Sequence, residues 1–142
     1  GERLPLRLIR QQQARFSHNE ITMIIRNWED VTPYIGHETA IIWPIFRAKG
    51  AKDLTEREAP LLSTVGFTLH RMQAGMEGDY HDHKDREQIY YFTEGRGKMK
   101  IDDEVYGVRK GDTVHIPPKT KHQLINDSDG WIEHLIVTAE VP

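Results

Sequence analysis

The 142-residue sequence predicts an all-β fold, a sandwich or a closed barrel. Short apolar runs, most of them about four to ten residues long, follow one another and are separated by Gly, Pro, Asp and Asn. Long helical stretches are missing, so few or no helices are expected. Many short strands joined by regular turns bury their apolar faces when two sheets pack together or when one sheet closes on itself.

The chain begins with a predicted N-terminal extension or arm over residues 1–20, and residues 21–142 fit one domain. The arm carries four arginines among leucines and isoleucines. It lacks the long apolar core and the small-residue cleavage site of a targeting peptide. We interpret it as a surface arm or an added extension, with a segment packing on a partner subunit as the alternative.

Two edge strands are predicted next. Residues 21–26 are short and rich in β-branched side chains, and a turn follows them. Residues 39–46 form a second apolar run, in which Pro44 favours an edge position or a bulge. Such an edge would suit a contact between subunits.

The polar segment 49–60 predicts either one short helical turn or a loop, with Asp53 as a candidate N-cap and Glu56 three residues on. From residue 63 the short strands predominate. Hairpin turns are expected at Asp102-Asp103 and over residues 126–130. The predicted strands are 63–72, 80–83, 88–93, 97–101, 105–108, 113–116, 122–125 and 131–138.

Composition narrows the functional classes. The net charge is -3, from 19 basic and 22 acidic residues, so neither nucleic acid nor a membrane is an expected partner. Cysteine is absent, which excludes disulfides, thiolate nucleophiles and Cys-based metal sites. The eight histidines remain as the main candidate ligands for a transition metal. We expect a cytoplasmic protein.

His81-Asp82-His83 is the first candidate metal-binding sequence. Side chains alternate faces along an extended strand, so two imidazoles separated by one residue can reach the same ion. Residues 111–122 end on a third candidate, His122. His70, His115 and His134 lie on predicted strands and could line a pocket, but each alone is more typical of an ordinary histidine. His37 lies in a loop and carries no functional signal.

Two stretches of the chain resemble the sequence motifs of the cupin superfamily. The first motif, G-x5-H-x-H-x3/4-E-x6-G, is matched by Gly75, His81, His83, position 88 and Gly95, with Gln at position 88 in place of Glu. The second, G-x5-P-x-G-x2-H-x3-N, is matched by Gly111, Pro117, His122 and Asn126, with Lys119 in place of Gly. The resemblance implies a jelly-roll β-barrel with an internal divalent metal.

The resemblance implies a fourth ligand beside the three histidines, and two residues compete for that place. The spacing to Gly95 favours Gln88, whereas Glu87 fits the shorter gap after His83. Register decides between them: if Gln88 faces the lumen, Tyr90 faces it too, and Glu87 points elsewhere. We predict His81, His83, Gln88 and His122 as ligands. Tyr90 is the candidate general acid or base.

The predicted function is that of a metal-dependent enzyme acting on an oxygenated small molecule. Three neutral imidazoles and a neutral amide leave the full charge on the ion, which favours Lewis-acid chemistry of the lyase, isomerase or cyclase type. A dioxygenase using Fe or Cu and a non-catalytic small-ligand-binding module are the alternatives. Zn, Fe, Ni, Cu, Co and Mn all suit this ligand set. A homodimer is expected.

Overall fold

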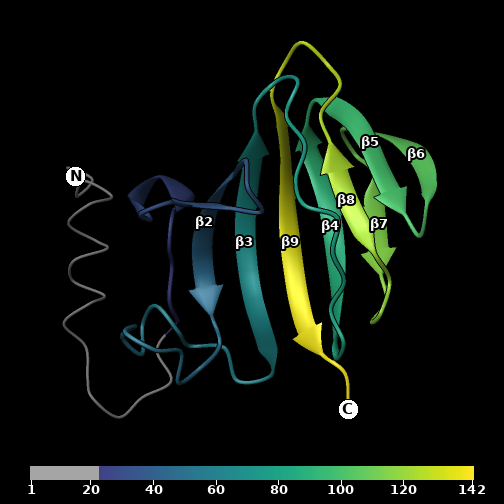
Figure 1. Ribbon diagram of the computed structural model, residues 1–142. Helices are drawn as coiled ribbons and strands as arrows, with labels where there is room; N and C mark the ends of the chain where they lie inside the picture. The colour runs from purple at the N-terminus through teal and green to yellow at the C-terminus, as the bar shows by residue number, and fades with distance from the viewer. Residues whose placement is uncertain (1–22) are drawn as a thin grey trace, which may run out of the picture.

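The computed structural model describes residues 23–142, which form nine strands in two antiparallel sheets (Figure 1). The larger sheet has the order β1-β2-β3-β9-β4-β7 and the smaller has the order β6-β5-β8. The larger sheet comprises β1 (Tyr34–Gly36), β2 (Ala40–Arg47), β3 (Thr64–Met72), β9 (Ile132–Glu140), β4 (Arg86–Glu94) and β7 (Thr113–Ile116). The smaller comprises β6 (Glu104–Arg109), β5 (Arg96–Ile101) and β8 (His122–Ile125).

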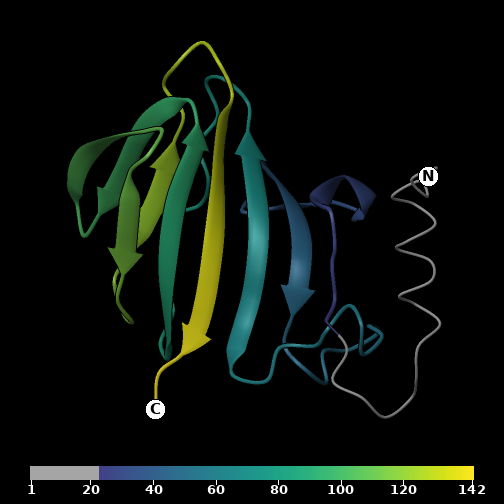
Figure 2. The same ribbon diagram turned by 180° about the vertical axis from the view of Figure 1, so that it is seen from behind.

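The smaller sheet lies over one face of the larger sheet, on the side of β4 and β7 (Figures 1 and 2). Residues 73–85, between β3 and β4, run beside β8 and are joined to it by isolated bridges from Glu77 to Ile125 and from His81 to His122. This segment therefore continues the smaller sheet at its edge. An internal binding site would therefore lie between these two layers.

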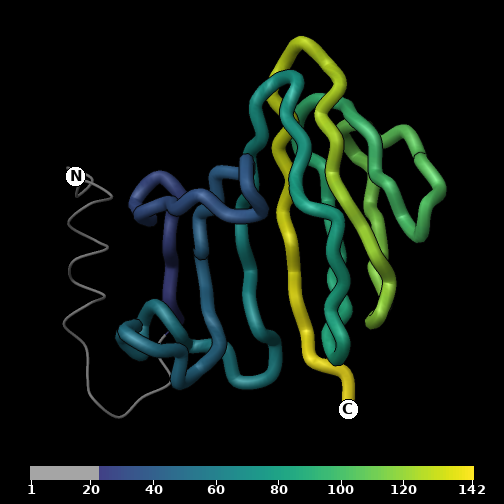
Figure 3. Tube along the Cα trace, in the orientation of Figure 1, coloured from purple at the N-terminus to yellow at the C-terminus, as the bar shows by residue number. Residues whose placement is uncertain are grey.

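The chain passes from the smaller sheet into β9 through the turn over residues 126–131, beside the end of β3 (Figure 3). Asn126 holds this corner and is fully buried. Its amide nitrogen donates to the carbonyl oxygens of Met72, Gln73 and Gly130 at 2.8–3.1 Å. Its amide oxygen accepts hydrogen bonds from Ser128. A buried amide with both ends satisfied fixes the crossing between the sheets.

Alternation along β4 sets which side chains enter the interior. Gln88, Tyr90 and Phe92 are buried, whereas Ile89 and Tyr91 are exposed. This is the pattern of a strand with one face on the core and the other in solvent. The interior is completed by a cluster of apolar side chains from both sheets: Ala40, Ile42, Met72, Met99, Val108, Ile116, Leu124, Ile132 and Ile136.

The all-β prediction is confirmed, and helix in the described range is one 3-10 turn, Trp28–Asp30. Two predicted strands are wrong. Residues 23–26 are not in a strand, and 80–83 contributes one bridge at His81. A strand needs a partner along its length, and the 80–83 segment pairs with β8 over too short a distance to form a ladder. The predicted arm at 1–20 lies outside the described residues.

The polar segment 49–60 forms turns, and its capping interaction starts two residues later than predicted. Thr55 and Glu58 bond reciprocally: the Thr55 amide and hydroxyl donate to the Glu58 carboxylate, and the Glu58 amide donates to the Thr55 hydroxyl. Asp53 instead has a left-handed backbone, with φ 60°. Asp53 as an N-cap was therefore wrong. No helix in residues 23–142 has the length and hydropathy to cross a bilayer.

Candidate metal centre

Three histidines converge between the two sheets. His81 and His83 come from the segment before β4, and His122 opens β8. Each offers a ligand nitrogen within 4.8 Å of the others. All three Nε2 atoms are buried and have no hydrogen-bond partner. A buried polar atom without a partner is costly, so three aimed at one place form a group that can hold a metal ion.

Backbone pairing explains why residues 41 positions apart in the chain meet. The His81 amide donates to the His122 carbonyl at 3.1 Å, and the His122 amide donates to the His81 carbonyl at 2.8 Å. Directly opposed residues in an antiparallel pair hold their side chains side by side. The Lys119 amide donates to the His83 carbonyl, which fixes the third imidazole against the same loop.

The other ring nitrogens are bound in a way that selects the tautomer. The Nδ1 atom of His122 lies 2.9 Å from the Thr120 carbonyl oxygen, and that of His81 lies 3.2 Å from the Asp79 carbonyl oxygen. A carbonyl oxygen only accepts, so each Nδ1 carries the proton and each Nε2 presents a lone pair. Such second contacts orient metal-binding imidazoles and raise their basicity.

Burial also favours the neutral form of His122 and His83 in the absence of an ion. Desolvation lowers the pKa of His122 to about 4, although its bond to the Thr120 carbonyl acts in the opposite sense. Burial, followed by the neighbouring His81, lowers the pKa of His83. A neutral imidazole is the form that binds metal, so protons compete weakly for this site near neutral pH.

The register of β4 places Gln88 inside and Glu87 outside. Gln88 is 8% exposed; its amide nitrogen donates to Thr138 Oγ1 at 3.1 Å, and its oxygen accepts from the Tyr90 hydroxyl at 3.4 Å. Glu87 pairs with His115 on the outer face, with Oε2 and Nε2 3.0 Å apart. The structure therefore brings Gln88 and Tyr90 to the interior and takes Glu87 and His115 away from it.

Tyr90 is buried between His122 and His134, stacked on His134 with ring centroids 5.1 Å apart. Burial raises the pKa of its hydroxyl further above its ordinary value. Tyr90 therefore stays protonated across the physiological range and acts as a hydrogen-bond donor toward Gln88.

A cavity of about 20 Å³ adjoins His81 and His122, which is room for one water-sized group. Its polar lining includes His70 and His134, which were candidates to line a pocket, and His37, for which no functional role was predicted. His70 and His134 are register partners on β3 and β9, and His37 comes from the β1–β2 turn. No local pattern in the sequence marks these three residues as one group, because it is the order of the strands in the sheet that brings them together.

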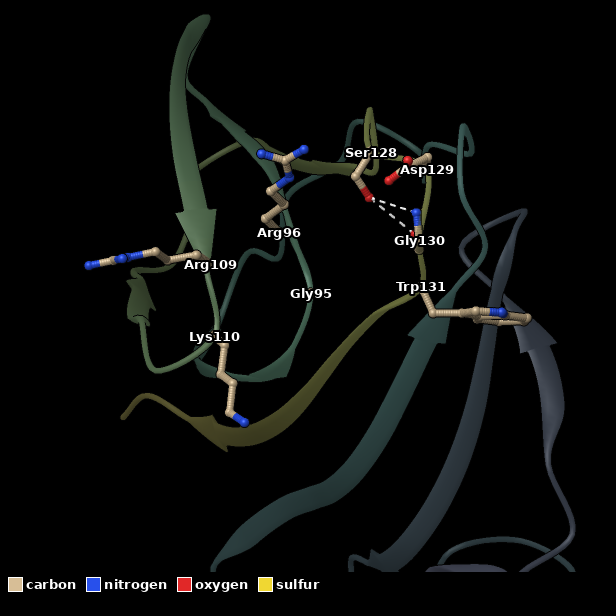
Figure 4. A pocket seen from close by; sticks show the side chains of 8 residues that line it. All are labelled: Gly95, Arg96, Arg109, Lys110, Ser128, Asp129, Gly130 and Trp131. Atoms are coloured by element: carbon tan, nitrogen blue, oxygen red, sulfur yellow. Dashed lines mark hydrogen bonds between the residues drawn. The ribbon is translucent and has the colours of Figure 1, made fainter.

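The larger hollows in the described structure lie elsewhere. One, of about 480 Å³, is open to solvent beside the β4–β5 and β8–β9 turns (Figure 4). The side chains of Arg96, Arg109 and Lys110 leave it in different directions (Figure 4), so they do not converge on one ligand. The histidine cluster is the stronger candidate, because several polar groups converge there on one point.

Backbone conformation explains why the two motifs have glycine at particular positions. Gly95 and Gly111 have φ 81° and φ 92°, where side chains are strained. Lys119, which stands where the motif has Gly, has φ 61°. This position requires the left-handed conformation, and lysine adopts it at a conformational cost of roughly 1–2 kcal/mol. Lysine at this position therefore adopts the backbone conformation that glycine favours.

Comparisons with known proteins agree with the fold and the motifs. A family model described as a cupin domain matches residues 68–138. An uncharacterized protein of Methanocaldococcus jannaschii is 37% identical over 109 residues, which are 75% of this chain and 79% of that protein.

Similar solved structures share the architecture. One is a predicted oxalate decarboxylase from Thermotoga maritima, with a TM-score of 0.69, 18% identity, and coverage of 84% of this chain and 100% of that chain. Another is an ectoine synthase from P. lautus, with a TM-score of 0.65, 17% identity, and coverage of 84% and 80%. A sugar phosphate isomerase of the cupin superfamily from Silicibacter pomeroyi has a TM-score of 0.63 at 16% identity, with coverage of 82% and 75%.

At these identities the structural likeness establishes the fold alone, and the family rests on the domain match over residues 68–138. The two motifs, the paired antiparallel sheets and the enclosed histidines are all features of one family. The chain belongs to the cupin superfamily.

Proposed function

We propose that the protein is a metal-dependent cupin enzyme in which His81, His83, His122 and Gln88 hold one divalent transition metal. The observation that carries the proposal is the set of three buried Nε2 atoms without partners. Gln88 is the fourth ligand in this proposal, because its amide nitrogen is engaged by Thr138 and its oxygen is directed to the interior side of β4.

The ligand set determines the chemistry that we expect. Bound among neutral imidazoles and a neutral amide, a divalent ion acts as a Lewis acid on a carbonyl, hydroxyl or enolate oxygen. Tyr90 donates a hydrogen bond to Gln88 in the structure and is the candidate to donate one to a substrate oxygen. Its raised pKa favours donation of a hydrogen bond over action as a base.

The cavity has room for one water-sized group, so its lining limits only the part of a substrate that enters beside His81 and His122. Among residues 23–142, no lysine or arginine lines it, and the one acidic side chain is Asp79. A phosphate or a second carboxylate would therefore find no cationic partner beside the metal. We infer a small oxygenated substrate whose charge, if it has one, is carried by the group that binds the metal.

The proposal favours lyase, isomerase or cyclase chemistry. The neutral ligand set disfavours oxidation of a divalent ion to the trivalent state, which makes a dioxygenase using Fe or Cu the second candidate. The structural likeness to a sugar phosphate isomerase and to an ectoine synthase is compatible with the first group. A homodimer and a cytoplasmic location remain part of the proposal.

Metal content tests the site. Wild-type protein, His122→Ala, Gln88→Glu and the surface control His115→Ala are titrated with Co²⁺ and measured by visible absorbance and elemental analysis. We expect one tightly bound ion per chain in wild type and His115→Ala, and loss of tight binding in His122→Ala. Gln88→Glu should keep the ion, because a carboxylate is an equally good ligand. Equal binding by wild type and His122→Ala would contradict the proposal.

Turnover separates the functional alternatives. Wild type and Gln88→Glu are incubated anaerobically and in air with small hydroxy acids, diketones and aldoses. Lewis-acid catalysis predicts the same rate under both conditions, and a lower rate in Gln88→Glu, because the anionic ligand reduces the effective charge of the ion. Activity that requires oxygen would establish the dioxygenase alternative, and thermal shifts without turnover would establish a binding module.

A further inference from the structure

We propose that the turn between β1 and β2 is part of the metal site: His37 holds Asp79, and Asp79 fixes His81 in the orientation and tautomer that bind metal. The inference rests on the proposed metal site and adds two positioning residues that contact no metal themselves. It assigns a role to a turn that lies 44 residues before the first ligand in the chain and carries no motif.

The contacts form a continuous series. His37 Nδ1 lies 3.0 Å from Asp79 Oδ1, and His81 Nδ1 lies 3.2 Å from Asp79 Oδ2. The same His81 nitrogen lies 3.2 Å from the Asp79 backbone oxygen. Since every one of these oxygens accepts, both Nδ1 atoms carry protons, and His81 Nε2 is left with its lone pair on the side of His83 and His122.

The ring of His37 adds a second constraint on His81. The two imidazoles are stacked, with centroids 4.7 Å apart and planes 18° apart. His81 is therefore held at its Nδ1 edge by Asp79 and across its face by His37. An imidazole fixed on an edge and a face has little freedom to rotate away from the position that suits the metal.

The turn is docked on the segment that carries Asp79. The Thr39 hydroxyl donates to the Glu77 carbonyl oxygen at 2.9 Å. A Cβ atom added at Gly78 would lie 3.4 Å from the His37 carbonyl oxygen, so the two backbones approach closely. This close approach brings His37 within reach of the Asp79 carboxylate.

The backbone of the turn has the left-handed conformation of a tight β-hairpin. His37 and Glu38 have φ 47° and φ 68°, consecutive left-handed residues that are not glycine. Each costs on the order of 1–2 kcal/mol. The His37–Asp79 contact does not offset this as an ion pair, because the side chains are 33% and 36% exposed and solvent screens the interaction.

His37, Asp79 and His81 also lie close enough together to be considered as a second metal site. The backbone carbonyl oxygen of Asp79 argues against it, because that contact requires a proton on His81 Nδ1. A hydrogen-bonded nitrogen has no lone pair for an ion. His37 and Asp79 therefore orient His81 for the first metal site and do not form a second one. A stoichiometry of two ions per chain would overturn this assignment.

Four variants test the role of the turn. Asp79→Asn removes the charge that fixes His81, and Asp82→Asn is the matched control, since Asp82 is exposed and lies on the other side of His81. His37→Gly removes the imidazole, while His37→Asn keeps an amide nitrogen in the place of Nδ1. Both glycine and asparagine tolerate the left-handed backbone, so the comparison isolates the side chain.

The first readout is the dissociation constant for Co²⁺, with circular dichroism as the check on folding. We expect an increase of about 10–100-fold in Asp79→Asn and in His37→Gly, and a smaller change in His37→Asn. Asp82→Asn should bind as wild type does. Equal affinities in Asp79→Asn and Asp82→Asn would overturn the proposal.

The second readout needs no metal and separates this inference from the proposed function. Long-range ¹H–¹⁵N spectra of metal-free protein report which nitrogen of His81 carries the proton. We expect an Nδ1–H tautomer in wild type and a partial shift toward the Nε2–H form in Asp79→Asn, where the Asp79 backbone oxygen remains as an acceptor but the carboxylate is lost. If wild type binds no metal, the metal proposal fails. If the His81 tautomer is the same in Asp79→Asn and wild type, the positioning inference fails whatever the metal affinity.

Discussion

His134 and His115 have the same side chain in opposite environments, and the burial of each residue decides what it does. His134 is 2% exposed, lies against Tyr90 and Phe92, and has an Nδ1 atom without a partner. His115 is on the outer face of β7, paired with Glu87. Desolvation lowers the pKa of His134 to about 3, so this ring stays neutral in the folded protein.

The pKa of His134 predicts that the metal-free protein loses stability in mild acid. Unfolded histidine binds a proton near pH 6.5, whereas folded His134 does so only near its pKa of about 3. Between these values the unfolded state holds more protons, so the free energy of unfolding falls as the pH falls, by up to about 1.4 kcal/mol per pH unit. Urea unfolding from pH 7.5 to 5 measures this slope.

A variant pair identifies the residue responsible for that slope. His134→Leu removes one titrating group and should reduce the dependence of unfolding free energy on pH, while His122, whose pKa burial lowers to about 4, keeps its share. His115→Leu should leave it unchanged, because that side chain is 58% exposed. A slope shared equally by wild type and His134→Leu would assign the effect to another group, with His70, whose pKa burial also lowers, as the next to test.

In strand β4, the register of strand pairing decides which side chains face the interior. Its inward residues meet Thr138, Ile136 and His134 of β9 across the ladder. A shift by one residue would bring Glu87 inside and place Gln88 in solvent. The register is fixed at the end of β4 by Gly95, where the chain reverses into β5 against the β8–β9 corner.

Gly95 and Gly111 form a matched pair for testing that turn. Both have positive φ, yet a Cβ atom at Gly95 would overlap the Trp131 carbonyl oxygen, whereas Gly111 has nothing within 4 Å. Gly111→Ala should therefore cost backbone strain of roughly 1–2 kcal/mol. Gly95→Ala should cost about 1–3 kcal/mol more, because the backbone of the adjoining corner must move. Denaturant midpoints measure the difference, and equal losses would argue against the clash.

At the scale of the whole molecule, the proposed metal links parts that the chain connects only distantly. His122 comes from the smaller sheet, Gln88 from the larger sheet, and His81 and His83 from the segment between them. An ion bound by all four stabilises the folded state relative to the unfolded one by about 2.7 kcal/mol when its concentration is 100 times its dissociation constant.

Metal removal should therefore lower the melting temperature. For a chain of this size we expect a loss of roughly 5–10 °C on treatment with chelator, restored by adding Co²⁺. Calorimetry of His122→Ala supplies the control: its melting temperature should respond to neither treatment. An equal response in wild type and in this variant would place the bound ion elsewhere.

The expected homodimer also belongs to this scale. β1 is the outer strand of the larger sheet, and its Tyr34 and Ile35 are 46% and 65% exposed. Among residues 23–142, no strand pairs with the outer edge of β1, and an apolar edge strand is a surface on which a second chain can pair. Light scattering should give twice the mass of one chain for wild type and the mass of one chain for Ile35→Lys. A monomeric wild type would contradict the prediction.

The sequence by itself determined the fold class and the three histidines. Short strands, turn residues and the two cupin motifs are local features, and local features can be seen along a chain. That Gln88 and Glu87 lie on opposite faces of β4 could also be predicted, because side chains alternate along a strand with a period of two residues. Only which face lies inside required the neighbouring strands.

The tertiary structure decided the rest of the site. His37, Asp79, His70 and His134 come from a turn, a loop and two strands, and their contacts depend on which strands are neighbours. The histidines of the 80–83 segment meet His122 although the segment forms no strand, because one bridge to His122 is enough to align the rings. The spacing of the candidate ligands can be seen in the sequence. The groups that orient those ligands are brought together only by long-range packing.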